Sequence, residues 1–257
     1  MTIRHSIIAA IAVLAVAAAG WFLYPHLTQR AAPKPFFADW GAVVVAGDWR
    51  AASGEPSDVF DNGRRAIAKK LVAAGFPADH VLQYSVQPQR HTQDLAMPAT
   101  AEEITEGLNA LGRNAPGGCL AYFTSHGEEG EGIIIGDRLV DPAPIAERIT
   151  AACGDRPTVV VISACFAGQF IPALRGPRRI VLAAARADRS SFGCGEDDEY
   201  TFYDACMLQQ FDRAAGFREL ASFVEDCVRK REAEMDMDPP SEPQFFMGAD
   251  VAHANWK

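Results

Sequence analysis

The feature that most constrains the fold is a set of short apolar runs, rich in β-branched residues, that leave no polar face. Two of them are residues 40–48, WGAVVVAGD, and residues 158–163, TVVVIS. A strand without a polar face must be covered on both sides, which is typical of a parallel sheet packed between helices. These runs therefore predict an α/β fold with buried strands.

Helical patterns alternate with the apolar runs. We expect further strands over 80–86, 119–125, 178–185 and 244–250, a short hairpin over 132–140, and helices over 59–74, 100–113, 141–153, 201–213 and 217–235. Thr100 and Glu103 form a capping-box pattern at the start of one of these helices. Strands that alternate with helices predict an α/β/α sandwich with a mainly parallel sheet of about six strands.

The first thirty residues differ from the rest. Residues 7–24 carry no charge, and Pro25 follows them. That length is at the lower limit for a membrane-spanning helix. We therefore expect an N-terminal hydrophobic helix over 1–30 that anchors an exported globular domain in the membrane. Small residues over 15–19 leave signal cleavage and secretion as the alternative.

After this segment, residues 31–39 are predicted to form a tether and residues 40–257 a single domain. The formal net charge is −9 and the basic residues are scattered, which argues against a nucleic-acid partner. The six cysteines contain no CxxC pair, so we expect no metal site. The sequence also lacks a phosphate-binding loop, so we expect no cofactor. In an exported chain one or two disulfides are plausible, and the sequence leaves their pairing open.

Ligands of parallel sheets bind beyond the carboxyl ends of the strands. His126 follows the predicted strand 119–125, and Cys165 follows the strand 158–163. A lone cysteine at a strand end is usually a small buried hydrophobe, and a lone histidine beside a glycine is usually a surface residue. At equivalent ends of consecutive strands, however, a thiol and an imidazole favour a Cys–His hydrolase.

Three segments around these residues resemble the core blocks of the legumain-type cysteine peptidases, which have a caspase-like fold. They are 121–132 (AYFTSHGEEGEG), 159–174 (VVVISACFAGQFIPAL) and 184–205 (AARADRSSFGCGEDDEYTFYDA). The run 40–49, WGAVVVAGDW, is similar to the first strand of that family. The resemblance spans about residues 38–250 and implies a caspase-like α/β/α sandwich.

The resemblance also implies roles for individual residues. Cys165 corresponds to the nucleophile and His126 to its partner, which protonates the leaving amine. The backbone N–H groups of Gly127 and Cys165 correspond to the oxyanion hole. Ser191 matches a residue of the specificity pocket, and Asp204 matches the acidic wall of that pocket.

One segment departs from the family pattern. Plant and animal members carry an Arg-His pair that reads the asparagine side chain of the substrate, and here Asp61-Asn62 stands near that place. Arg64 and Arg65 are displaced along the chain and are expected to point elsewhere. Asp61 is therefore a candidate substrate-binding residue, and the residue after which the enzyme cleaves is open.

Three functions are compatible with these residues. The first is a cysteine endopeptidase that hydrolyses peptide bonds through a thioester and acts on a peptide or protein substrate without a cofactor. The second is a transamidase that uses the same dyad and resolves the thioester with an amine. The third is a catalytically silent caspase-fold binding module at the membrane. The oligomeric state is open.

Overall fold

The computed structural model of the protein describes residues 35–257, which form one compact unit. The predicted signal anchor or signal peptide over 1–30 and the first part of the predicted tether lie outside these residues. In the described part of the chain, none of the helices combines the length and the apolar character needed to cross a bilayer. The end of the predicted tether packs onto the domain, because Phe37 is buried against Trp40 and Phe76.

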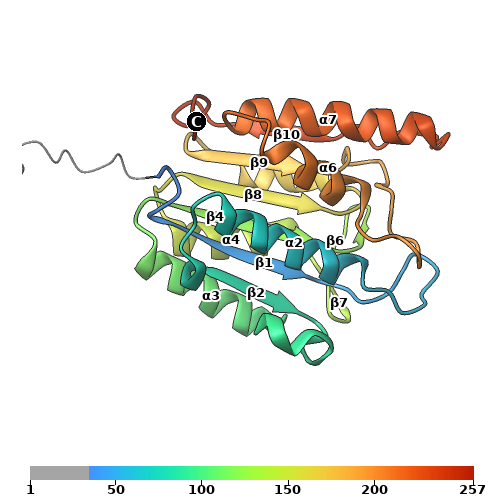
Figure 1. Ribbon diagram of the computed structural model, residues 1–257, viewed down its shortest axis with the longest axis horizontal. Coiled ribbons are helices and arrows are strands. Elements are labelled where there is room, and N and C mark those ends of the chain that lie inside the picture. The colour runs from blue at the N-terminus through green and yellow to red at the C-terminus, as the bar shows by residue number, and fades with distance from the viewer. Residues whose placement is uncertain (1–34) are drawn as a thin grey trace, which may run out of the picture. The chain divides into compact units, whose positions relative to one another are not determined.

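A seven-stranded sheet forms the centre of the domain, in the order β10-β9-β8-β4-β1-β2-β3 (Figure 1). Its strands are β1 (Trp40–Ala46), β2 (Val81–Ser85), β3 (Met97–Pro98), β4 (Gly118–Thr124), β8 (Thr158–Ser163), β9 (Arg179–Ala183) and β10 (Gln244–Met247). Every neighbouring pair is parallel except β9 and β10. The predicted mainly parallel sheet is confirmed, and the strand beyond the expected number is the two-residue edge strand β3.

Helices cover both faces of this sheet. They are α2 (Val59–Ala73), α3 (Ala101–Asn114), α4 (Pro142–Cys153), α5 (Ile171–Leu174), α6 (Phe202–Phe211) and α7 (Phe217–Glu234), with short 3-10 turns η1 (Ala78–His80), η2 (Pro88–Asp94) and η3 (Ala167–Phe170). One apolar cluster joins the sheet to α2, α6 and α7, and a second joins the opposite face to α3, α4 and α5.

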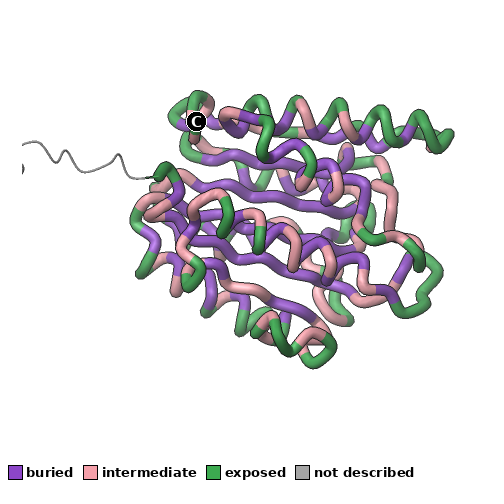
Figure 2. The backbone as a smooth tube through the Cα atoms, viewed as in Figure 1, coloured by how far each residue is buried: buried purple, intermediate pink, exposed green. Residues whose placement is uncertain are grey.

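The two faces explain why the central strands have no polar side. Val44 of β1 packs in the first cluster, whereas its neighbours Val43 and Val45 pack in the second, because successive side chains of a strand point to opposite faces. All residues of β1, β4 and β8 are buried (Figure 2). The apolar runs therefore fold as the sequence predicts.

A small antiparallel sheet lies at the carboxyl end of the large one (Figure 1). It consists of β5 (Gly127–Glu128), β6 (Gly132–Ile135) and β7 (Arg138–Val140). The predicted hairpin over 132–140 is the pair β6 and β7. β5 adds to it directly after the strand β4, so the hairpin is attached to the loop that carries His126.

Two disulfides lie within the described residues. Cys119 of β4 bonds Cys153 of α4, and Cys206 of α6 bonds Cys227 of α7. Cys165 and Cys194 are free. The pairing that the sequence left open thus involves four of the cysteines and leaves the candidate nucleophile reduced.

Candidate active site

The two candidate catalytic residues come from neighbouring parallel strands. β4 and β8 are paired up to Thr124 and Ser163, and the chain then runs to His126 on one strand and to Cys165 on the other. The following glycine brings the two loops into contact. A Cβ atom at Gly127 would lie 2.3 Å from the carbonyl oxygen of Cys165, so a larger residue does not fit there.

The ring of His126 is held from two sides. Its Nε2 lies 3.0 Å from the carbonyl oxygen of Arg50, and Phe60 packs edge-to-face against the ring with a centroid distance of 4.9 Å. A carbonyl oxygen only accepts hydrogen bonds, so Nε2 carries the proton in this arrangement. Nδ1 is then the nitrogen of the neutral ring that is available for proton exchange.

An ion pair fixes the loop that presents this carbonyl. Asp48, which is buried, accepts two hydrogen bonds from the Arg50 guanidinium, at 2.9 and 3.1 Å, and one from the Trp49 backbone N–H at 2.7 Å. The hydrogen bonding of the Arg50 guanidinium to Asp48 raises the pKa of Arg50. Neither residue was predicted from the sequence, although both follow the carboxyl end of β1 and the strand-end rule applies to them as it does to His126.

The thiol of Cys165 lies against Ser191. The backbone N–H of Ser191 donates to Sγ at 3.3 Å, and the Ser191 hydroxyl oxygen lies 3.6 Å from Sγ. The residue after the cysteine, Phe166, has φ 57°, in the left-handed region that non-glycine residues adopt mainly in strained or functional turns.

The backbone N–H of Cys165 has no hydrogen-bond acceptor among residues 35–257. A free N–H beside the candidate nucleophile is what an oxyanion hole would require. The role predicted for this group and for the Gly127 N–H is compatible with their positions and stays a prediction.

These residues line one open cleft of about 870 Å³. Four of the residues singled out from the sequence are part of its lining, namely His126, Gly127, Cys165 and Ser191. The cleft also contains Asp48, Arg50, Glu128, Cys194 and Asp198. The structure therefore brings together the predicted dyad, the predicted oxyanion groups and one predicted specificity residue.

Asp204 does not line this cleft, and its predicted place in the wall of the substrate pocket is corrected. The side chain is fully buried and accepts hydrogen bonds from the hydroxyls of Tyr122 at 2.7 Å and Thr124 at 2.6 Å. Burial raises its pKa, and these hydrogen bonds oppose the rise. Asp204 lies in the first turn of α6, and Thr201 caps that helix. The Thr201 hydroxyl accepts a hydrogen bond from the Asp204 backbone N–H at 3.0 Å and lies 3.2 Å from the Ser163 hydroxyl. It therefore ties the ends of β4 and β8 to a helix.

Asp61 also lies outside the cleft lining, so its position does not fit the predicted contact with substrate. Its carboxylate accepts from Arg64 Nε at 2.8 Å and from the Ser85 hydroxyl at 2.9 Å. The Arg64 side chain is fully buried and also contacts Asp94 at 3.2 Å, and Arg65 pairs with Asp94 at 2.7 Å. The two arginines thus point elsewhere, as expected from the sequence, and Asp61 belongs to the ion-pair network around the buried Arg64.

The second free cysteine, Cys194, was not singled out from the sequence. It lines the same cleft as Cys165, and burial raises its pKa to about 11. At neutral pH such a thiol is protonated and a poor nucleophile. Cys194 lies in the segment 184–205 that resembles a family block, so its place near the site could be predicted. That its thiol is not in a disulfide could not, because this depends on which other cysteines pair.

Comparison with known proteins gives the same assignment as the motifs. Residues 102–216 match the model of the Peptidase C13 family. Among solved structures, caspase-1 from Spodoptera frugiperda matches with a TM-score of 0.59 and 15% sequence identity, over 86% of this chain and 92% of that chain. No curated protein sequence matches this chain.

At that identity the structural match shows the fold, which is caspase-like. The segment that matches the family model contains both His126 and Cys165. Motifs and family match agree: over residues 102–216 the chain is similar to the Peptidase C13 family, and its fold is caspase-like.

Proposed function

We propose that this protein is a cysteine endopeptidase that hydrolyses peptide bonds with a His126–Cys165 dyad. The observation that carries the proposal is the placement of both side chains in one open cleft, at the ends of the paired strands β4 and β8. An open cleft also argues against the alternative of a catalytically silent binding module, whose cleft has no need to admit a peptide.

The reaction follows from the contacts of the two residues. Cys165 Sγ adds to the carbonyl carbon of the peptide bond, and its proton passes to His126. The free backbone N–H of Cys165 and that of Gly127 stabilise the oxyanion. His126, held by the Arg50 carbonyl, then gives the proton to the leaving amine as the C–N bond breaks, which leaves a thioester. Water cleaves the thioester, releases the carboxylic acid and restores the thiol.

The charges of the cleft favour substrates with basic side chains near the cleaved bond. Arg50 is neutralised by Asp48, whereas Glu128 and Asp198 leave the cleft with acidic groups. Attraction between exposed charges is screened by salt. A peptide library should therefore show a preference for lysine and arginine that weakens as the salt concentration rises.

The decisive test uses a thiol-directed peptide probe on the full chain. The unmodified protein should give one adduct on Cys165, Cys165→Ala should lose both the adduct and peptidase activity, and Cys194→Ser should keep both. Equal melting temperatures exclude misfolding of the variants. Activity that survives in Cys165→Ala, or an adduct on Cys194 alone, contradicts the proposal. Products formed with an added primary amine separate hydrolysis from transpeptidation through the same thioester.

We further propose that the domain works outside the cytoplasm, with residues 1–30 as its membrane anchor. The two disulfides support this location, because such bonds persist in oxidising compartments. Labelling of intact cells with a membrane-impermeant thiol reagent, before and after reduction, tests the proposal. The proposal would be contradicted if all cysteines stayed protected from the reagent in cells whose outer layer is permeabilised but whose cytoplasmic membrane is sealed.

A further inference from the structure

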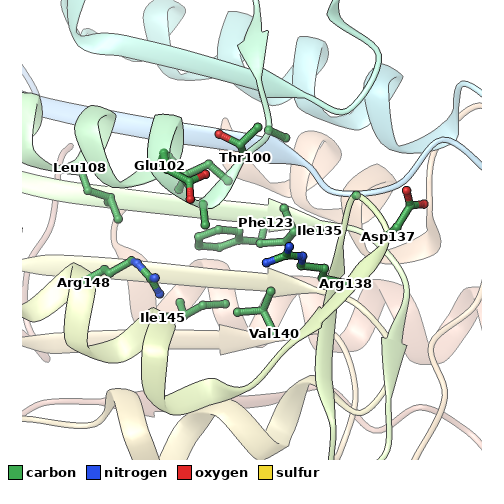
Figure 3. A pocket seen from close by; sticks show the side chains of 14 residues that line it. Thr100, Glu102, Leu108, Phe123, Ile135, Asp137, Arg138, Val140, Ile145 and Arg148 are labelled. Atoms are coloured by element: carbon green, nitrogen blue, oxygen red, sulfur yellow. The ribbon is translucent and has the colours of Figure 1, made fainter.

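A second cavity, separate from the catalytic cleft, lies between α3, α4 and the β6–β7 hairpin (Figure 3). Its volume is about 360 Å³, which is within the range of about 300–1,000 Å³ typical of small-molecule sites. The walls are mainly apolar and include Ile104, Leu108, Phe123, Ile135, Val140 and Ile145. A pocket of this kind takes a ligand with an apolar body.

Two arginines stand at this cavity without an acidic partner. Arg138 extends from β7 toward the ring of Phe123, and Arg148 reaches in from α4 (Figure 3). Within residues 35–257 neither guanidinium forms an ion pair, and the hydrogen bond of Arg148 is to the carbonyl of Pro144 at 3.2 Å. Each therefore has N–H donors to offer to an anion.

The acidic side chains in the lining do not neutralise these arginines. Asp137 points away from the cavity in Figure 3 and lies 4.0 Å from Arg50. Glu102 is an exposed residue in the first turn of α3, where the helix dipole favours a negative charge. Neither carboxylate lies within ion-pair distance of Arg138 or Arg148, since no such pair occurs in the described part of the chain.

We propose that this cavity binds a small apolar carboxylate, such as a medium-chain fatty acid. The apolar walls would hold the hydrocarbon body, and the guanidinium groups of Arg138 and Arg148 would hold the carboxylate by charge-assisted hydrogen bonds. The proposal does not depend on the peptidase activity, because none of the residues that line this cavity lines the catalytic cleft.

The test is photolabelling of the full chain with a diazirine-bearing decanoic acid, followed by mapping of the labelled peptides. We expect label within residues 99–108 and 135–148 and competition by unlabelled decanoate. The matching alcohol probe should label about tenfold less, because it lacks the charge that the arginines bind. Label spread over the surface, or equal labelling by acid and alcohol, would overturn the proposal.

Variants make the test specific to the cavity. Arg138→Gln and Arg148→Gln should each lower labelling by the acid about tenfold. Arg218→Gln, an exposed arginine on α7 over the other face of the sheet, should leave it unchanged. Ala101→Phe should also reduce labelling, since this exposed residue lines the cavity and a larger side chain fills it. Unchanged labelling in all three cavity variants overturns the proposal.

Discussion

The carboxyl end of the sheet carries two sets of polar residues that differ in burial. His126 and Cys165 are half-buried and line the cleft, whereas Thr124, Ser163 and Asp204 are fully buried. Both sets belong to the ends of β4 and β8 and the segments attached to them. The difference separates two tasks at one edge, because the first set is accessible to a substrate and the second set holds the strand ends in place.

The largest expected effect comes from the accessible set. His126→Ala removes the proposed proton donor for the leaving amine, so we expect kcat/KM to fall by about 10³-fold. The melting temperature should stay close to that of the unmodified protein, since the ring is only half-buried. Steady-state kinetics and thermal unfolding check both statements. Loss of stability on a scale that explains the loss of activity would contradict the separation of tasks.

Substitutions in the buried set should instead lower the stability of the fold. Asp204→Ala leaves the hydroxyls of Tyr122 and Thr124 buried without their acceptor, which we expect to lower the free energy of unfolding by about 3 kcal/mol. Urea unfolding measures the change. Asp197→Ala, an exposed carboxylate in the preceding loop, is the matched control and should change it by less than about 0.5 kcal/mol. A stable Asp204→Ala protein would show that the buried set is not a support.

The raised pKa of Asp204 predicts a pH dependence. Between the ordinary carboxyl pKa of about 4 and its raised value, the folded state binds more protons than the unfolded state. Stability therefore falls as pH rises through that interval. Asp204→Asn has no such proton, so its stability relative to the unmodified protein should improve as pH rises above about 4. Urea midpoints at a series of pH values test this, and a constant difference between the two proteins would contradict it.

A smaller effect is expected at the Asp48–Arg50 pair, which belongs to neither set but positions His126. Asp48→Asn weakens the ion pair that holds the loop, so we expect kcat to fall about tenfold with little change in KM. Asp137→Asn is the control, because Asp137 is exposed and lies 4.0 Å from the same guanidinium. Equal effects of the two variants, or a change confined to KM, would show that the pair does not act through the histidine.

The comparison also explains which parts of the structure were predictable. The strands could be predicted because continuous apolar runs specify buried strands, and the strand-end rule then placed His126 and Cys165 at one edge of the sheet from local sequence alone. Asp204 and Asp61 could not be placed that way. Whether a carboxylate faces a cleft or the interior depends on how α6 and α2 pack on the sheet, and that packing joins residues about 80 positions apart, as in the contact of Asp204 with Thr124.

The second cavity and the disulfides were hidden for the same reason. The cavity exists only because α3, α4 and the β6–β7 hairpin meet, and its apolar residues look like ordinary core positions in the sequence. The cysteine pairing likewise depends on which helix covers which strand. Short-range patterns therefore predicted the elements and the position of the candidate nucleophile, whereas contacts between layers required the structure.

The order of the cysteines along the chain has a consequence for how the protein matures. The first disulfide joins Cys119 and Cys153, both of which are synthesised before Cys165, and the second joins two cysteines that come after Cys194. Each bond can close between cysteines that follow one another along the chain, so no thiol–disulfide exchange through Cys165 is needed. The cysteine left beside Cys165 in the cleft is Cys194, whose pKa of about 11 keeps it protonated and slow in thiol exchange. Two disulfides can thus form in the chain while Cys165, the proposed nucleophile, stays a thiol.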